Sequence, residues 1–450
     1  MLKIKFKVKQ ILLLALLTLT CFNSGAKQLY IEITGGQNVG IPIAVMPFTT
    51  VSSANPIDDM VEVEDLAAII SNDLHNSGHF HSLNVQHVDQ KPKDSNEVNR
   101  GYWKNLGAAN LVLGKIISKG DGAYDVNFQL IDIYKDNQQP LINIRFKDKY
   151  PEQFRALAHY ISDMIFKKIT GIRGFFSTRI AYITMDRYKD ETIHTLTVAD
   201  ADGFNDKPVV STTYPLMSPR WSPDGKKIAF VSFRGHRSSV NVVTLINGEI
   251  EQISRFPGIN GAPAWSPDGN KLALVLSKDG SPNIYVLDLA SKQLRQLTTG
   301  MSINTEPYWH PQGNSILFTS NRGGKPQIYQ VALHNGEVQR LTFTGDYNAT
   351  PSLTPDGKKL IMLHQSEKGA YNIAVQDLST GKVKSITNAR LDESPTLAPN
   401  GMMILYGMRE TSQTVLGAVT LDGRFRMRLP VQDSNVKEPS WSPFLLEDWQ

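Results

Sequence analysis

The stretch Pro219-Arg220-Trp221-Ser222-Pro223-Asp224-Gly225 returns five more times, in altered form, along this chain of 450 residues. Its second copy is Pro263-Ala264-Trp265-Ser266-Pro267-Asp268-Gly269, and weaker copies follow. The first prolines of the six copies are spaced by 44 residues and are Pro219, Pro263, Pro307, Pro351, Pro395 and Pro439. A repeat of about 40–50 residues made of short strands is typical of a β-propeller, with one blade per repeat. The spacing therefore predicts a ring of six blades around a channel.

Each repeat predicts four strands. The Pro-x-Trp strand comes first, and the second repeat continues with apolar segments at residues 271–277, 283–289 and 294–298. The sixth repeat shows only its first strand, so we expect residues 179–214 to supply the other three. The segments 180–184, 194–199 and 208–211 resemble the second, third and fourth strands of a repeat. Pairing of the C-terminal strand with these segments would close the ring and remove exposed strand edges.

The first 26 residues are interpreted as a cleavable signal peptide. Four lysines precede an apolar run over residues 11–19, and Ser24-Gly25-Ala26 provides the small residues of a cleavage site. The run is too short to span a bilayer, which needs about 20 apolar residues. The only cysteine, Cys21, lies in this segment, and Thr18-Leu19-Thr20 before it is a poor lipoprotein processing site. We expect an exported mature chain without disulfides.

Removing residues 1–26 removes four lysines and no acid, which takes the formal charge from +4 to zero. A chain without a net basic surface is a poor candidate for nucleic-acid binding.

Residues 27–173 lack the repeat and are predicted to form an α/β domain, followed by the propeller at 174–450. Strands are expected over residues 41–48, 111–118 and 124–134. Helices are expected over 60–75 and 153–170, with Gly171 as the C-cap of the second. The mature start, residues 28–34, alternates apolar and polar side chains and precedes Gly35, Gly36 and Gly40. It is either the first strand of this domain, the interpretation we favour, or a strand that is added to a partner's sheet edge.

The Ser-Pro-Asp-Gly segments and the tryptophans are interpreted as structural, because Pro, Asp and Gly suit tight turns and Trp suits packing between blades. The residues before each repeat proline differ in polarity from copy to copy. They connect one blade to the innermost strand of the next and are expected to surround one mouth of the channel. Divergent loops on a repeated scaffold indicate a binding surface. The candidate residues are Met217, Ser218, Ile259, Asn260, Gly261, Ala262, Asn304, Thr305, Glu306, Asn348, Ala349, Thr350, Asp392, Glu393, Ser394, Lys437 and Glu438.

Two possible metal sites have less support in the sequence than this binding surface. Carboxylates at Glu306, Asp392, Glu393 and Glu438 could converge on a cation such as Ca²⁺, but no known ligand spacing supports this. His75, His79, His81 and His87 lack a matching second ligand set. We therefore predict no metal and no cofactor. No nucleophile elbow, phosphate loop or His-Glu-x-x-His motif is present either.

The mature start Leu29–Gly36, the segment 41–48 and the six repeats together resemble the TolB family, the periplasmic propeller proteins of the Tol–Pal system. The phrases Asn260-Gly261-Ala262-Pro263, Asn304-Thr305-Glu306-Pro307 and Leu391-Asp392-Glu393-Ser394-Pro395 carry the resemblance most specifically. It covers essentially the whole mature chain. One departure is Ile259, an apolar side chain where we expect a polar one.

The resemblance implies a monomeric, non-enzymatic periplasmic adaptor. It implies that the lipoprotein Pal binds at the channel mouth, on the candidate residues above, and that some toxins exploit the same mouth. It implies that TolA binds the mature N-terminal segment and that the system supports outer-membrane integrity and constriction during division. The residues implied for TolA are Gln28, Leu29, Tyr30, Ile31, Glu32, Ile33 and Thr34.

Two other functions remain open on sequence grounds. The propeller of a peptidase-like envelope enzyme would need a hydrolase domain, for which residues 27–172 are too few. A glycan-binding propeller would carry aromatic residues on the mouth loops, where only Tyr347 is found close by.

Overall fold

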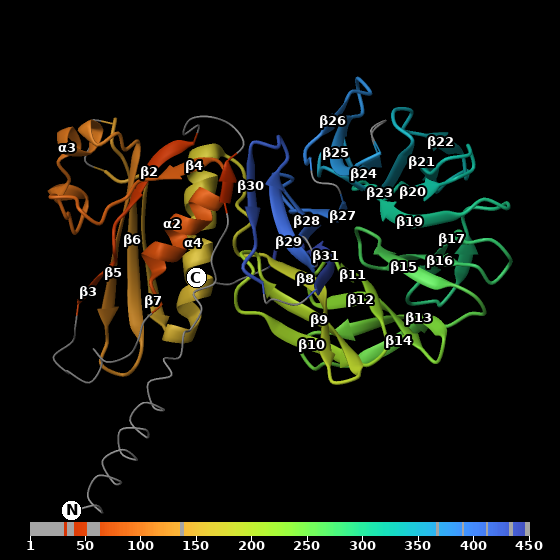
Figure 1. Cartoon of the computed structure of the whole chain (residues 1–450). Coiled ribbons are helices and arrows are strands. Elements are labelled where there is room, and N and C mark those ends of the chain that lie inside the picture. Colours follow the sequence, from red (N-terminus) through yellow and green to blue (C-terminus); the bar gives the residue numbers. More distant parts are fainter. Residues whose placement is uncertain are drawn as a thin grey trace, which may run out of the picture.

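The computed structural model describes residues 31–33, 40–51, 64–135, 139–365, 369–388, 391–410, 413–431 and 435–445. An α/β domain lies beside a six-bladed β-propeller (Figure 1), which confirms the predicted fold class. The predicted signal peptide, residues 1–26, lies outside the described residues, as do Gln28, Leu29, Tyr30 and Thr34 of the N-terminal segment.

The α/β domain is built on one sheet with strand order β4-β2-β5-β6-β7, and β3 also pairs with β5. The strands are β2 (Ile41–Val45), β3 (Thr49–Val51), β4 (Phe80–Ser82), β5 (Asn110–Ser118), β6 (Tyr124–Asp132) and β7 (Ile142–Lys149). The helices are α2 (Leu66–Asn76), α3 (Arg100–Asn105) and α4 (Phe154–Thr170), with short 3₁₀ turns η2 (Ser95–Glu97) and η3 (Pro151–Gln153).

Helix α4 follows the predicted pattern. Its apolar face, including Leu157, Ile161 and Ile165, is fully buried and packs against the core of the domain. Gly171 ends the helix as a left-handed C-cap with φ of 79°, a conformation that glycine adopts without cost. The predicted strands correspond to β2, β5 and β6, and the described part of the first predicted helix is α2. Strand β7 was not predicted.

Each propeller blade is a four-stranded antiparallel sheet whose first strand lies innermost (Figure 1). We name each blade by that strand. Three blades consist of β31 (Asn435–Trp441) with β8 (Arg179–Tyr188), β9 (Glu191–Asp200) and β10 (Lys207–Thr212); β11 (Leu216–Trp221), β12 (Lys227–Arg234), β13 (Arg237–Thr244) and β14 (Ile250–Ser254); and β15 (Asn260–Trp265), β16 (Lys271–Leu276), β17 (Asn283–Asp288) and β18 (Leu294–Gln296).

The other three blades continue the ring. They consist of β19 (Asn304–Trp309), β20 (Ser315–Ser320), β21 (Gln327–Ala332) and β22 (Val338–Arg340); β23 (Tyr347–Leu353), β24 (Lys359–Gln365), β25 (Tyr371–Asp377) and β26 (Val383–Ser385); and β27 (Asp392–Leu397), β28 (Met403–Glu410), β29 (Gln413–Thr420) and β30 (Phe425–Arg428).

The ring closes as predicted. Strand β31 pairs antiparallel with β8, from Asn435 opposite Met185 to Trp441 opposite Ile180. One blade is therefore assembled from two segments, β8 to β10 and β31, that are more than 220 positions apart in the chain. This pairing covers the strand edges that would be exposed if the ring were open.

The repeated tryptophans connect neighbouring blades. The indole N–H of Trp265 donates to the carbonyl oxygen of Arg220 at 3.1 Å, and that of Trp309 donates to Ala264 at 3.0 Å. The indole N–H of Trp221 makes the same kind of bond to the carbonyl oxygen of Ser440 at 3.2 Å, and Ser440 lies in β31, the strand that closes the ring. The predicted structural role of these residues is confirmed.

The Ser-Pro-Asp-Gly segments are turns. The Ser222 hydroxyl donates to the Asp224 carboxylate at 2.5 Å and accepts from the backbone N–H of Lys227 at 2.9 Å. Gly225 has φ of 68°, the left-handed conformation that the turn requires. The structural interpretation of these motifs is confirmed.

The N-terminal segment does not begin the α/β domain. Strand β1 (Ile31–Ile33) pairs antiparallel with β30 and becomes the fifth and outermost strand of the β27 blade. The favoured interpretation, a first strand of the α/β sheet, is therefore wrong. The physical reason is that β30 ends its blade and offers unpaired backbone groups along its outer edge.

A buried cluster of charges joins the two domains. His159 on α4 contacts the carboxylate of Asp73 on α2, with 2.8 Å between His159 Nδ1 and the Asp73 oxygen. Its other ring nitrogen lies 3.7 Å from a carboxylate oxygen of Asp202, in the turn that follows β9. Arg155, one helical turn before His159, forms ion pairs with Asp202 and, at 3.2 Å, with Asp200. The cluster fixes α4 to one blade of the propeller.

Loss of β31 should open the ring. A chain truncated after Pro430 lacks the strand that pairs with β8, so two blade edges become exposed. We predict aggregation or a large fall in the midpoint of thermal unfolding. A chain truncated after Leu445 keeps β31 and serves as the control. An unchanged midpoint in the shorter chain would contradict the closure account.

The interdomain cluster should make stability depend on pH. Burial alone would lower the pKa of His159, but the charge of Asp73 and its hydrogen bond outweigh burial and raise that pKa to about 9. Because the folded pKa exceeds the unfolded value near 6.5, the stabilisation is complete below pH 6.5 and is lost as pH rises through 9. The difference corresponds to roughly 3 kcal/mol.

The matched variant is His159→Gln, which has no titrating side chain. Thermal unfolding midpoints of the natural chain should fall between pH 6.5 and pH 9, whereas those of the variant should stay level across that window. Parallel curves for the two proteins would show that His159 does not carry the effect.

Candidate partner-binding site at the channel mouth

The candidate site lies where the six innermost strands begin. Each receives the chain from the outermost strand of the preceding blade, so the connecting loops gather at one end of the channel (Figure 1). The α/β domain contacts the opposite strand ends. Asn400, in the turn after β27, donates to the backbone of Arg173, and Arg155 contacts the turn after β9. Among the described residues, these contacts place the α/β domain at the end of the propeller opposite the mouth.

The residue before each repeat proline has an unusual backbone. All six are non-glycine residues with φ between 42° and 54°, and each lies where the register of its innermost strand shifts. Such left-handed conformations cost free energy and persist only where surrounding contacts enforce them. The six residues are Ser218, Ala262, Glu306, Thr350, Ser394 and Glu438.

Two acidic side chains at this position connect adjacent blades. A carboxylate oxygen of Glu306 accepts from the Thr319 hydroxyl at 2.7 Å and from the backbone N–H of Thr350, in the next blade, at 2.9 Å. Glu438 accepts from the backbone N–H of Ser218 at 2.5 Å across the seam. Both carboxylates therefore stabilise the strained backbone of a neighbouring blade.

The charges in the channel compensate one another. Burial raises the pKa of Glu438, while the Ser218 hydrogen bond and the positive charge of Arg220 lower it in part. Burial lowers the pKa of Arg220, and the negative charges of Glu438 and Glu306 oppose that effect. Arg220 therefore lies among acids from two other blades.

The residue three positions before the proline is buried in every repeat. The Asn260 side chain accepts from the backbone N–H of Phe256 at 2.8 Å and donates to its carbonyl oxygen at 2.7 Å. Burial raises the pKa of Asp392 to about 6, against the opposing effects of the Thr387 hydroxyl and the charge of Arg426. These side chains shape the loops from inside the fold. The predicted site residues with this position are Asn260, Asn304, Asn348 and Asp392.

The other predicted residues differ in exposure. Met217 and Ile259 are exposed, with 40% and 49% of their surface accessible, and Ala349 is buried. The remainder are half-buried: Ser218, Gly261, Ala262, Thr305, Glu306, Thr350, Glu393, Ser394, Lys437 and Glu438.

An apolar ring at the mouth was missed by sequence reasoning. Ile303 and Leu391 have 49% and 38% of their surface exposed, and Tyr347 is half-buried. They share one repeat position with Ile259, four residues before the proline. Ile259 is therefore not unusual among the repeats of this chain, because the same position holds Ile303, Tyr347 and Leu391. The signal was the same spacing of 44 residues.

More aromatic residues lie on the connecting loops than expected. Phe256 and Phe343 follow the outermost strands of their blades and have 37% and 74% of their surface exposed. Met301, on the loop between them, is 92% exposed. The mouth therefore presents a broader apolar surface than Tyr347 alone.

Comparisons with known proteins point to one family over nearly the whole chain. A family model described as the TolB beta propeller domain matches residues 166–445, and one described as the TolB amino-terminal domain matches residues 29–139. The chain is 54% identical to the Tol-Pal system protein TolB of Coxiella burnetii (strain RSA 493 / Nine Mile phase I), over 96% of this chain and 98% of that protein. This chain belongs to the TolB family.

Further relatives agree with this assignment. The Tol-Pal system protein TolB of Nitrosococcus oceani is 55% identical, over 92% of this chain and 93% of that protein. The crystal structure of TolB from Acinetobacter baumannii superposes with a TM-score of 0.83 at 38% identity, over 93% of this chain and 100% of that one. The TolB family consists of non-enzymatic periplasmic propeller proteins of the Tol–Pal system, which removes the peptidase interpretation. None of the helices in the described residues has the length and apolar character to cross a membrane.

In the part of the chain that the structure describes, the acids and histidines considered above as metal ligands do not come together as a group of three donor atoms. The one group of potential ligands there with donor atoms close enough to share an ion is Asp73, His159 and Asp202, in the interdomain cluster. The rings of His75 and His81 lie 6.4 Å apart, and His79 bonds to the backbone of Ser77.

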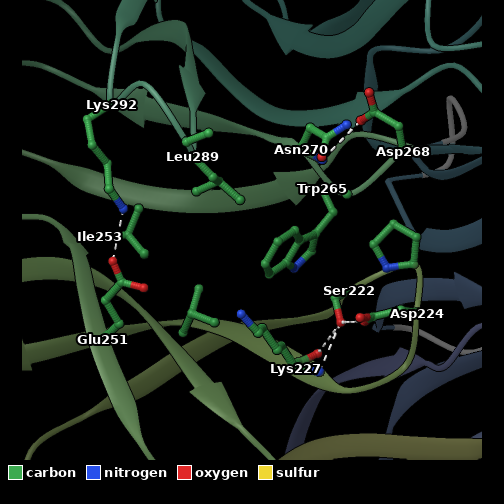
Figure 2. A pocket seen from close by; sticks show the side chains of 14 residues that line it. Ser222, Asp224, Lys227, Glu251, Ile253, Trp265, Asp268, Asn270, Leu289 and Lys292 are labelled. Atoms are coloured by element: carbon green, nitrogen blue, oxygen red, sulfur yellow. Dashed lines mark hydrogen bonds and ion pairs between the residues drawn. The ribbon is translucent and has the colours of Figure 1, made fainter.

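A cavity of about 660 Å³ lies between the β11 and β15 blades, at the strand ends opposite the mouth. Figure 2 shows the side chains that line it. Its polar side chains bond to one another. Glu251 and Lys292 form an ion pair at 3.0 Å, and Ser222 contacts Asp224 within its turn. The cavity is therefore lined by the turns that connect strands within the blades, and it is not part of the candidate site at the mouth.

Glu306 should act on stability. Replacing it with alanine leaves the Thr350 N–H and the Thr319 hydroxyl without this acceptor, which should cost about 1–3 kcal/mol of unfolding free energy. Glu191→Ala, at an exposed acid on β9, is the control and should leave stability nearly unchanged. Denaturant unfolding measures both. Equal stabilities would show that the bond between blades contributes nothing.

Proposed function

We propose that this chain is an adaptor of the Tol–Pal system that binds the lipoprotein Pal at the channel mouth and TolA through residues 28–34. Residues 1–26 act as a signal peptide that directs export to the periplasm and is then removed, and the mature chain supports outer-membrane integrity and constriction during division. The observation that carries the proposal is the exposed apolar ring on the strained loops of a closed scaffold.

The mouth has the composition of a protein-binding surface. Apolar side chains at Met217, Ile259 and Ile303 are exposed on adjoining loops, beside half-buried polar groups such as Thr305. Apolar anchors surrounded by polar groups are typical of protein interfaces. The backbone beneath them is fixed by bonds between blades, so little conformational entropy is lost when a partner binds.

The N-terminal segment has the geometry expected of an exchangeable strand. Strand β1 is three residues long and, within the described residues, has β30 as its one pairing partner. A segment that adds to its own propeller as an edge strand can add in the same way to another sheet edge. The mode proposed for TolA is therefore transfer of this strand from β30 to a TolA sheet.

One sheet connects the two proposed sites. Its strand order is β1-β30-β29-β28-β27, and its innermost strand begins with the candidate residues Asp392 and Glu393. A partner that alters the backbone of β27 at the mouth can therefore affect β1 through adjacent hydrogen-bonded strands. We propose that Pal favours the paired form of β1 and so opposes TolA.

The double variant Ile259→Asp/Ile303→Asp tests the mouth. Both side chains are exposed, so the fold should be preserved while the apolar surface becomes charged. We expect Pal affinity to fall by at least about thirtyfold, the factor that corresponds to a loss of 2 kcal/mol. Ile246→Asp, at a side chain that is 94% exposed on the opposite turns, is the control. Unchanged Pal affinity in the double variant, measured by calorimetry, would refute the assignment.

Deletion of residues 28–34 tests the N-terminal segment. We expect it to abolish TolA binding and to leave Pal binding intact. In the undeleted chain, saturating Pal should weaken TolA binding by roughly 5–150-fold, since couplings between sites are typically about 1–3 kcal/mol and are reciprocal. Identical TolA affinities with and without Pal would reduce the segment to a simple tether.

A glycan-binding propeller is a second candidate, favoured by the exposed aromatic rings of Phe256 and Phe343. An array of envelope glycans tests it. Binding that is lost in a Phe256→Ala/Phe343→Ala variant, together with unchanged Pal affinity in the mouth variant, would replace the adaptor by this function.

A further inference from the structure

The cavity of about 660 Å³ between the β11 and β15 blades is a candidate ligand site separate from the mouth. Its volume lies within the roughly 300–1,000 Å³ typical of small-molecule sites in proteins. Figure 2 shows the ring of Trp265 and the side chain of Lys227 projecting into this space from the two blades. The cavity therefore offers an aromatic surface and a charged donor to the same ligand.

The space is open because the long cation that crosses the next junction between blades is replaced here. Arg295, on the outermost strand of the β15 blade, donates to the carbonyl oxygen of Leu333 in the following blade at 2.7 Å. The corresponding residue of the β11 blade is Glu251, which instead forms an ion pair at 3.0 Å with Lys292. Both side chains of this pair are more than half exposed, so the pair lies at the rim and leaves the space between the blades open.

Trp265 offers ring carbons rather than a polar group to a ligand. Its indole N–H already donates to the carbonyl oxygen of Arg220 at 3.1 Å, which fixes the ring. The side chain is half-buried, so part of its carbon surface is accessible from the cavity. The face of an aromatic ring is electron-rich and attracts C–H groups with partial positive charge, such as those on one side of a pyranose. This wall therefore suits the ring of a sugar.

Lys227 lacks the acidic partner that the same position has in the next blade. Lys271 lies opposite Asp288 in the β15 blade, with 4.0 Å between its ammonium nitrogen and the carboxylate. The register of the β11 blade places Thr244 opposite Lys227 instead. Within the described ranges no carboxylate lies within ion-pair distance of Lys227. Its ammonium group therefore has N–H donors available to a ligand in the cavity.

The remaining walls combine an acceptor with apolar side chains. Oδ1 of Asp224 takes both hydrogen bonds of its turn, from the Ser222 hydroxyl at 2.5 Å and the backbone N–H of Lys226 at 3.1 Å. These bonds leave Oδ2 of the carboxylate to accept from a ligand. Ile253 and Leu289 pack on the core between the two blades and also line the cavity.

The charged groups of the lining nearly balance, with three acids and two amines: Asp224, Glu251, Asp268, Lys227 and Lys292. A lining with almost no net charge favours a neutral ligand over an ion. The ligand must also donate and accept hydrogen bonds, and it must carry apolar groups of its own. A sugar with an acetamido group combines these properties, because it has hydroxyl donors, an amide carbonyl acceptor and a methyl group.

We propose that this cavity binds an N-acetylhexosamine residue of an envelope glycan. The pyranose ring packs on Trp265, and the acetamido carbonyl oxygen accepts from the ammonium group of Lys227. The acetamido methyl group contacts Ile253 and Leu289, and a hydroxyl of the sugar donates to Asp224. The site is independent of Pal and TolA binding and lies apart from the aromatic residues at the mouth.

Two disaccharides with the same β-1,4 linkage test the ligand class on the mature chain. Di-N-acetylchitobiose carries the acetamido groups, and cellobiose has hydroxyl groups in their place. We expect saturation-transfer NMR to detect binding of chitobiose. The affinity for cellobiose should be at least about tenfold lower, because cellobiose loses the hydrogen bond to a charged donor and the methyl contact.

Two variants test the position of the sugar. Ala290→Trp places a large side chain at an exposed residue that lines the cavity and should abolish chitobiose binding by filling the space. His334→Trp, at the corresponding exposed turn of the next blade, is its control. Lys227→Met keeps the length of the side chain but removes the donor, and should weaken binding by about tenfold. Lys359→Met, at the same position of the β23 blade, should bind as the natural chain does.

Several results would overturn the proposal. One is the absence of saturation transfer with chitobiose at about 10 mM, where even a site of millimolar affinity is mostly occupied. Equal binding of the two disaccharides would refute the N-acetylhexosamine class. Binding that survives both Ala290→Trp and Lys227→Met, or that is lost in the Phe256→Ala/Phe343→Ala variant instead, would place the sugar outside this cavity.

Discussion

The pairing of β31 with β8 is the interaction on which the rest of the structure depends. It converts six successive sheets into a ring, because the last segment of the chain completes the blade that the first propeller segment begins. The indole N–H of Trp441, at the end of β31, also donates to the Thr178 hydroxyl at 2.8 Å. This bond connects the closing strand to the boundary between the two domains. Without closure, the loops at the mouth would lack a fixed mutual position.

In the ring, the residues that hold neighbouring blades together differ from the residues that form the exposed surface of the mouth. Bonds between blades are made by groups that face the channel or the neighbouring strand, as in Glu306 to Thr350 and Trp265 to Arg220. The apolar side chains four residues before the repeat proline, such as Ile259 and Ile303, cannot form hydrogen bonds between blades and are exposed. A repeat can therefore keep its blade geometry while its loops vary.

Much of the fold could be predicted from the sequence because the repeat encodes local structure. The spacing of 44 residues, the Asp-Gly turns and the apolar strands identify six blades, and the repeat-like segments 180–184, 194–199 and 208–211 identify the closing blade. The α4 helix followed from its apolar periodicity and from Gly171. These features depend on neighbours in the chain, which a single sequence shows directly.

The rest depended on contacts between distant residues. Asn260 looked like a surface residue because it is polar, but its side chain satisfies the backbone of Phe256 inside the fold. The pairing of β1 with β30 joins residues almost 400 positions apart, and no local pattern specifies which free edge a short strand will choose. The interdomain cluster likewise combines Asp73, His159 and Asp202 from three elements.

The central claim is that the mouth and the N-terminal strand form one responsive unit built on the β27 blade. Hydrogen exchange of the mature chain, with and without saturating Pal, tests it most directly. The account predicts added protection at the loops that carry Ile259 and Ile303, and also at β1 and β30 on the far edge of the same proposed unit. Protection confined to other surfaces, or protection of the loops with none at β1 and β30, would contradict it.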